Sequence, residues 1–77
     1  MTSIEERIVA AVKGAIEDAV VDVKGAGGHF EIRVVSPAFA GKSTLQKHRM
    51  VLGSIKHLMG GDGAEVHAID KLETVTQ

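Results

Sequence analysis

The four histidines are the residues best suited to metal chemistry, since the 77-residue chain contains no cysteine. Neutral imidazole nitrogen is a good ligand for iron, zinc and copper. The absence of cysteine excludes a disulfide framework, a cysteine-based zinc site, a cysteine nucleophile and an iron–sulfur cluster held by the chain's own thiolates. Any thiolate ligand would therefore come from a partner.

The elements that would position these histidines follow from periodicity and from turn residues. Ser3 begins a capping box with Glu6, and apolar residues at helical spacing predict a helix over residues 4–18. We expect a hairpin with strands at 20–24 and 29–36 around a glycine-rich turn at 25–28. A helical turn at 37–40, a helix from 44 to 59 that ends at the glycines of 60–63, and a last strand at 65–74 should follow.

This order predicts an α+β fold in one domain over residues 1–77. Strands joined through a helix usually run parallel, so the second and third strands should be parallel, with the first strand antiparallel. A three-stranded mixed sheet with both helices on one face would result. Parallel alignment then places His29 and His67 at the same end of the sheet.

Each histidine also has an ordinary structural explanation. His67 alternates with Ile69, which is typical of a half-buried strand residue, and His29 could simply close the glycine turn. His48 lies on the apolar stripe of the second helix, which favours a packed or capping role. His57 is expected to be a solvated helix residue.

Charge is unevenly distributed along the chain, although the net charge is only −1. The segment from Ile32 to Gly61 has no acidic residue but contains Arg33, Lys42, Lys47, Arg49 and Lys56. Lys42, Arg49 and Lys56 recur every seven residues, which is nearly two helical turns, so they should share a face. Most such faces are only solvated, but this one could also contact an acidic protein or track phosphates. The near-zero net charge and the small number of aromatic residues make sequence-specific DNA binding the weaker alternative.

Other functions find less support in the sequence. Residues 36–44 nearly match a phosphate-binding loop, but Ser36 and Pro37 replace the beginning of the motif. The chain is also too short for the nucleotide-binding domain that this motif serves. The amides at the start of the following helix, beside Lys42, could still hold a phosphate. No Ser-His-Asp arrangement or paired carboxylates indicate an enzyme. Glu5 and Glu6 stand where a signal peptide would be basic, and no apolar run approaches a membrane span of about 20 residues, so we expect a cytoplasmic protein without membrane contact.

The chain resembles the BolA family. The residues that carry the resemblance are Gly28-His29-Phe30, Val34-Val35-Ser36-Pro37-Ala38-Phe39-Ala40-Gly41-Lys42-Ser43, Gln46-Lys47-His48-Arg49 and Val66-His67-Ala68. The resemblance implies a fold like class II KH domains and a binding module that forms a heterodimer with a monothiol glutaredoxin in iron–sulfur cluster handling and iron regulation.

Within that heterodimer, the resemblance implies a shared two-iron two-sulfur (2Fe-2S) cluster, for which glutaredoxin and glutathione supply thiolates. His67 matches the family's C-terminal histidine ligand, and His29 matches a second candidate ligand in the hairpin. The isolated chain is expected to hold no cofactor and to be a monomer or a weak homodimer. The family is also associated with DNA binding, transcriptional regulation and stress responses, so a DNA-binding regulator that uses Lys42, Lys47, Arg49 and Lys56 is the alternative function.

Overall fold

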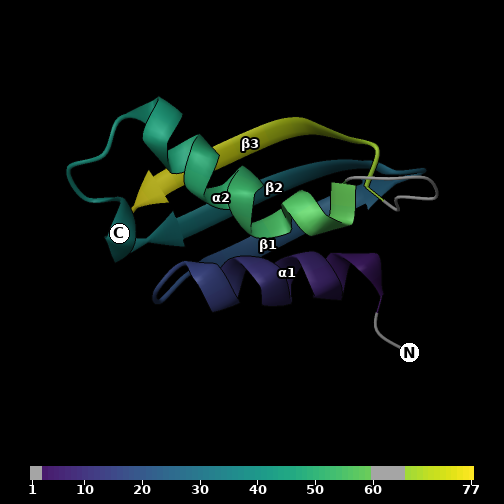
Figure 1. Ribbon diagram of the computed structural model, residues 1–77, viewed down its shortest axis with the longest axis horizontal. Helices are drawn as coiled ribbons and strands as arrows, with labels where there is room; N and C mark the ends of the chain where they lie inside the picture. The colour runs from purple at the N-terminus through teal and green to yellow at the C-terminus, as the bar shows by residue number, and fades with distance from the viewer. Residues whose placement is uncertain (1–2, 60–65) are drawn as a thin grey trace.

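The computed structural model describes residues 3–59 and 66–77, and its elements follow the order expected from the sequence (Figure 1). In these residues the elements are α1 (Ile4–Ala15), β1 (Val20–Ala26), β2 (His29–Ser36), a 3-10 turn η1 (Pro37–Phe39), α2 (Thr44–Met59) and β3 (Ala68–Thr76). The predicted stop signal at 60–63 and the predicted strand start at Glu65 lie outside the described residues.

The three strands form one mixed sheet in the order β1-β2-β3. β1 pairs antiparallel with β2, and β2 pairs parallel with β3, which confirms the predicted topology. Both helices lie in front of the same sheet face in Figure 1, so the other face of the sheet is left open. The α+β class and the arrangement of helices on one face are therefore confirmed.

Aliphatic side chains fill the space between the helices and the sheet. The buried core residues are Ile8, Val12, Ile16, Phe30, Ile32, Val34, Phe39, Val51, Ile55, Leu58 and Val66. β2 contributes every second residue to this core, as expected for a central strand with one covered face. Phe30 near the start of β2 and Ser36 at its end are both buried, so the core extends along the whole strand.

The hairpin turn is tighter than predicted. β1 continues to Ala26 and β2 begins at His29, so only Gly27 and Gly28 form the turn instead of the four residues 25–28. Both glycines have positive φ, 63° and 84°, as a two-residue type I′ turn requires. This turn type matches the twist of the paired strands, and the ladder extends to the pair of Ala26 with His29.

α1 ends three residues before the predicted boundary at Asp18. Ile16 has extended backbone angles and is buried in the core, while its N–H still bonds to the carbonyl of Val12. Asp18 has a φ of 50°, which reverses the chain direction toward β1. At the start of the helix, Ser3 Oγ accepts a hydrogen bond from Glu6 N–H at 3.2 Å, as the predicted cap requires. The chain therefore leaves the helix at Ile16 while this side chain still packs in the core.

α2 has the predicted bounds, whereas β3 is shifted along the sequence. Ser43 caps α2 with Gln46, because Gln46 N–H donates to Ser43 Oγ at 3.2 Å and Ser43 N–H donates to Gln46 Oε1 at 2.9 Å. β3 begins at Ala68 and continues to Thr76, two residues beyond the predicted end at Thr74. The helix runs back along the sheet and returns the chain to the end at which β2 began (Figure 1).

Candidate functional site

His29 and His67 come together at one end of the sheet, as the parallel topology predicts. The carbonyl of Gly28 accepts hydrogen bonds from the N–H groups of His67 at 2.8 Å and Ala68 at 3.1 Å. His29 itself is the register partner of Ala68 in the β2–β3 ladder. Backbone hydrogen bonds therefore hold the two histidines on adjacent chain segments.

The position of His67 differs from the half-buried strand residue that its alternation with Ile69 suggested. His67 immediately precedes β3 and is exposed. Its ring lies against the α-carbon of Gly28, where an added Cβ would come within 2.4 Å of Cδ2 of the imidazole. Gly28 thus supplies both the backbone turn and the space that the His67 ring occupies.

His29 is exposed as well, and it has a polar partner that the sequence did not reveal. Its Nδ1 lies 3.2 Å from Oδ1 of Asp70 on β3, and its side chain is 59% exposed. Both imidazoles at this end of the sheet are accessible from solvent. We call His29 and His67 the histidine pair.

The other two histidines lie on α2. His57 is exposed in the last turn of the helix, as expected, while His48 is half-buried. These burials agree with the predictions that His57 is solvated and that His48 has a packed or capping role.

The donor set of the histidine pair is incomplete for a metal site of its own. Among residues 3–59 and 66–77, no three histidine or acidic side chains gather closely enough to hold a metal ion. The full sequence has no cysteine. Two exposed imidazoles fit a site in which this chain supplies one or two ligands and another molecule supplies the rest.

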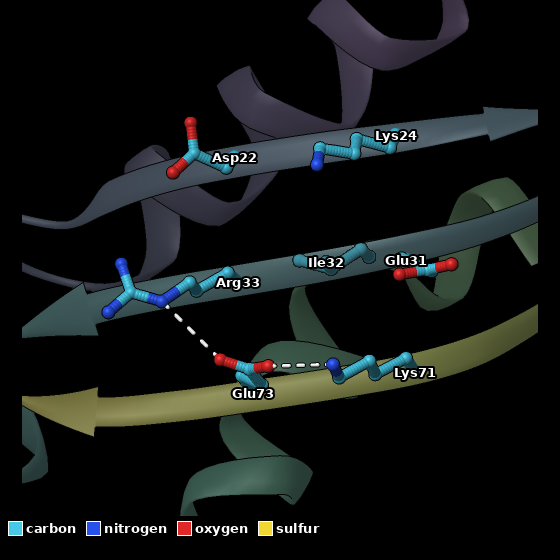
Figure 2. A pocket seen from close by; sticks show the side chains of 7 residues that line it. All are labelled: Asp22, Lys24, Glu31, Ile32, Arg33, Lys71 and Glu73. Carbon is cyan, nitrogen blue, oxygen red and sulfur yellow. Dashed lines mark ion pairs between the residues drawn. The ribbon is translucent and has the colours of Figure 1, made fainter.

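The open face of the sheet carries opposite charges side by side (Figure 2). Across the strands, one row contains Asp22, Arg33 and Glu73, and the next row contains Lys24, Glu31 and Lys71. Among these six residues the three acids and three bases cancel, so the two rows offer no excess positive charge to a nucleic acid or an acidic protein.

Glu73 is the centre of the ion pairs on this face. Arg33 Nε lies 3.4 Å from Glu73 Oε2, and Lys71 Nζ lies 3.0 Å from Glu73 Oε1. The hydrogen bond and charge of Lys71 lower the pKa of Glu73, and Glu73 in turn raises the pKa of Lys71. These groups are solvated, so their pairing neutralises the face without adding much stability.

The helical side of the molecule has a different surface. Leu45 and Leu52 are apolar residues of α2, yet they are 59% and 38% exposed. Positions 45, 49, 52 and 56 recur at helical spacing, so the two leucines share a strip with the exposed Arg49 and Lys56. We call these four residues the α2 outer strip.

Two of the other predicted basic residues lie outside this strip. Lys42 is exposed but precedes α2, in the connection that follows the end of β2, whereas His29 lies at the start of that strand. Lys47 is half-buried, and side chains two residues apart on a helix point to different sides, so Lys47 does not share the face of Arg49. A role for Lys47 in partner or nucleic-acid binding stays a prediction.

Comparison with known proteins identifies the family. A family profile described as BolA-like protein matches residues 8–77. The chain belongs to the BolA family. Protein BOLA2 from Arabidopsis thaliana is 41% identical over 61 residues, which cover 75% of this chain and 61% of the length of that protein.

Solved BolA structures share the fold of this chain. A bolA protein homologue from Coxiella burnetii has a TM-score of 0.76 at 28% identity, over 99% of this chain and 92% of that chain. BolA1 from Arabidopsis thaliana has a TM-score of 0.81 over 99% of this chain and 94% of that chain, and at 18% identity this likeness concerns the fold alone. Neither helix among the described residues of this BolA-family chain has the length and apolar character of a membrane-spanning segment.

The segment that nearly matches a phosphate-binding loop has a structural role at its beginning. Ser36 is fully buried, its hydroxyl donates to the carbonyl of Glu17, and its Oγ accepts from Ala38 N–H at 3.0 Å. At the other end, the first-turn amide of Gln46 is occupied by Ser43. These bonds connect the loop to the α1–β1 connection and leave fewer free amides for a phosphate than the sequence suggested.

We expect Ser36→Ala to destabilise this BolA-family fold by about 1–3 kcal/mol, because it leaves buried polar partners without a hydrogen bond. Urea denaturation followed by circular dichroism would measure the change. The exposed Ser43→Ala is the comparison, with a smaller expected loss of about 0.5–2 kcal/mol for a helix cap. Equal stability of Ser36→Ala and the unmodified chain would contradict this role for the hydroxyl.

Sequence reasoning missed three features of the site: the contact of Gly28 with His67, the contact of Asp70 with His29, and the exposure of the leucines in the α2 outer strip. The Gly-Gly pair before His29 was a signal for the first, because it favours a two-residue turn. The helical spacing of residues 45, 49, 52 and 56 was a signal for the third feature, because it places the two leucines on one strip with two basic residues. The Asp70 contact depends on an irregularity in strand pairing that no local pattern reveals.

Proposed function

We propose that this chain is a binding module that pairs with a monothiol glutaredoxin and supplies imidazole ligands to a shared 2Fe-2S cluster. The observation that carries the proposal is the convergence of two exposed histidines at one end of the sheet in a chain without cysteine. Glutaredoxin and glutathione supply the thiolates that this chain lacks. His67 is the first ligand from this chain, and His29 is the second candidate.

Membership of the BolA family supports this function over an enzymatic one. Among the described residues, no group of three or more histidine or acidic side chains could hold a metal ion, so the histidine pair fits a site that a partner completes. An exchangeable imidazole ligand suits a cluster that is transferred or sensed, and replacing thiolate by imidazole raises the reduction potential of such clusters. The cluster is the cargo of the heterodimer, and the isolated chain keeps none.

His67→Ala tests this function most directly. The heterodimer would be reconstituted with iron, sulfide and glutathione, and its visible absorption and circular dichroism would be recorded. We expect His67→Ala to change both spectra toward those of the glutaredoxin homodimer, because one imidazole ligand is lost. His57→Ala, which removes an exposed histidine from the last turn of α2, should leave them unchanged.

Two results would overturn the proposal. One is an identical cluster spectrum for the unmodified chain and His67→Ala. The other is stoichiometric cluster retention by the isolated chain after desalting, since a cysteine-free chain would then hold the cluster without a partner's thiolates.

The α2 outer strip supports a protein as the partner more than DNA. Basic side chains alone would suit phosphates, but the exposed Leu45 and Leu52 offer apolar contact area that a phosphate backbone does not use. A DNA-binding regulator remains the alternative function, because Lys42, Arg49 and Lys56 are all exposed. Failure to bind duplex DNA more tightly than about 10⁻⁴ M at physiological salt would remove it.

A further inference from the structure

A β-bulge interrupts the parallel ladder next to the histidine pair. Phe30 is the register partner of Ile69 and Glu31 is the partner of Lys71, so Asp70 is the extra residue with no partner on β2. Bulges of this kind bend a strand locally and change the direction of a side chain. The extra residue of the bulge, Asp70, is therefore also the residue that contacts His29.

The core explains why β3 needs this extra residue. Ile69 and Leu72 both pack against the buried core, although they are three positions apart. Strict alternation along a strand would turn two residues at that spacing to opposite faces. The bulge lets both side chains reach the core, and it leaves Asp70 on the outer side beside β2.

The carboxylate of Asp70 meets one particular nitrogen of His29. Oδ1 lies 3.2 Å from Nδ1, which is hydrogen-bonding distance. A neutral imidazole carries one N–H donor and one acceptor nitrogen, and an ionised carboxylate can only accept. Pairing with Asp70 therefore favours the proton on Nδ1 and leaves the lone pair of Nε2 available to a metal.

We propose that Asp70 is a positioning residue that keeps His29 in the Nδ1–H tautomer, so that Nε2 is the atom this histidine offers to the shared cluster. The proposal rests on the function proposed above. Carboxylate partners of this kind orient the ring of a metal-binding histidine and raise its basicity, and their loss typically lowers metal affinity about 10–100-fold. Asp70 thus acts through His29 and does not itself bind iron.

The tautomer can be measured on the free chain, without any cluster. Imidazole ¹⁵N chemical shifts would be recorded at increasing pH until they no longer change, so that the neutral ring is observed. We expect His29 to be mostly Nδ1–H, and Asp70→Ala to move it toward Nε2–H. Asp70→Asn should retain part of the preference, because its amide oxygen can still accept from Nδ1–H.

Asp22→Ala is the matched control, since it removes an exposed carboxylate from the open face of the sheet at a position paired with Arg33, whereas His29 pairs with Ala26. It should leave the tautomer of His29 unchanged. A predominantly Nε2–H form of His29 in the unmodified chain, or the same tautomer ratio in Asp70→Ala, would overturn the positioning role.

A second measurement separates this inference from the proposed function. In the glutaredoxin heterodimer, Asp70→Ala should reduce the iron retained after desalting about 10-fold and alter the visible circular dichroism, while Asp22→Ala should not. If His67→Ala changes the cluster spectrum and Asp70→Ala changes the tautomer but not the cluster, the positioning role fails and the proposed function stands. If neither His67→Ala nor His29→Ala affects the cluster, the proposed function fails, and any tautomer effect of Asp70 is then unrelated to a cluster.

Discussion

Gly28→Ala is expected to destabilise the hairpin and to displace the imidazole of His67. The φ of 84° at Gly28 costs a residue with a side chain about 1–2 kcal/mol. The new methyl group would also lie 2.4 Å from the His67 ring, and overpacking of this kind costs about 1–3 kcal/mol more. Both effects act at the end of the sheet that carries the histidine pair.

The adjacent Gly27 is a matched control for this substitution. Its φ is also positive, at 63°, but an added Cβ would meet nothing within 4 Å. Gly27→Ala should therefore lower the free energy of unfolding by about 1–2 kcal/mol and leave His67 in place. Urea denaturation would measure the first effect for each variant, and the imidazole ¹H and ¹⁵N shifts of His67 would measure the second.

The contrast between the two alanine variants tests the link between the turn and the site. We expect Gly28→Ala, and not Gly27→Ala, to shift the His67 resonances and to reduce cluster retention by the glutaredoxin heterodimer. Indistinguishable His67 resonances in the two variants would show that the bare α-carbon of Gly28 does not position the ring.

The sequence predicted the parts of this fold that depend on local patterns. Alternation in β2 and the Ser3 cap are visible in the sequence because they are determined by neighbouring residues. Parallel pairing of β2 with β3 followed from the intervening helix, and it placed His29 and His67 at one end of the sheet. That single topological inference accounts for most of the candidate site.

The features that were missed depend on contacts between distant segments. α1 ends before Ile16, which is buried in the core with an extended backbone, although the sequence predicted a helix to residue 18. Asp70 reaches His29 only because Ile69 and Leu72 both pack inward across a bulge. Leu45 looked like a core residue because it is apolar, and its exposure follows from where α2 rests on the sheet. Such outcomes are set by tertiary packing, which a single sequence does not specify locally.

The face of the molecule that a partner covers can be inferred from the same packing. The open sheet face is electrically balanced, with Glu73 paired to Arg33 and Lys71. The α2 outer strip combines apolar area with unbalanced positive charge over about 16 Å of helix. Central apolar contact with charged residues around it is typical of protein interfaces, and the charge of the strip favours an acidic partner surface.

Reversing both charges of the α2 outer strip, with Arg49→Glu and Lys56→Glu together, should weaken glutaredoxin binding about 100-fold. Each reversal replaces attraction by repulsion at the rim of the interface, and about 1.4 kcal/mol for each site corresponds to a tenfold change. Isothermal titration calorimetry at several salt concentrations would measure the loss, which should be largest at low ionic strength.

A control for overall charge is available elsewhere on the chain. Lys13→Glu with Lys24→Glu makes the same change in net charge, but on α1 and β1. This pair should leave the affinity for glutaredoxin within about threefold of the original, because non-specific charge effects are screened beyond roughly 10 Å. Circular dichroism of each variant would verify that the fold is retained. Equal losses for the two charge pairs would place the partner away from α2.

Leu45→Ser then distinguishes a protein partner from DNA. Because this leucine is mostly exposed, its replacement should leave the stability of the chain nearly unchanged but remove apolar contact from a protein interface, for an expected loss of about tenfold in affinity. Duplex DNA should respond to the charge reversals and not to Leu45→Ser, since its binding depends on phosphate contacts. An unchanged affinity of Leu45→Ser for glutaredoxin would contradict the assignment of the α2 outer strip to a protein partner.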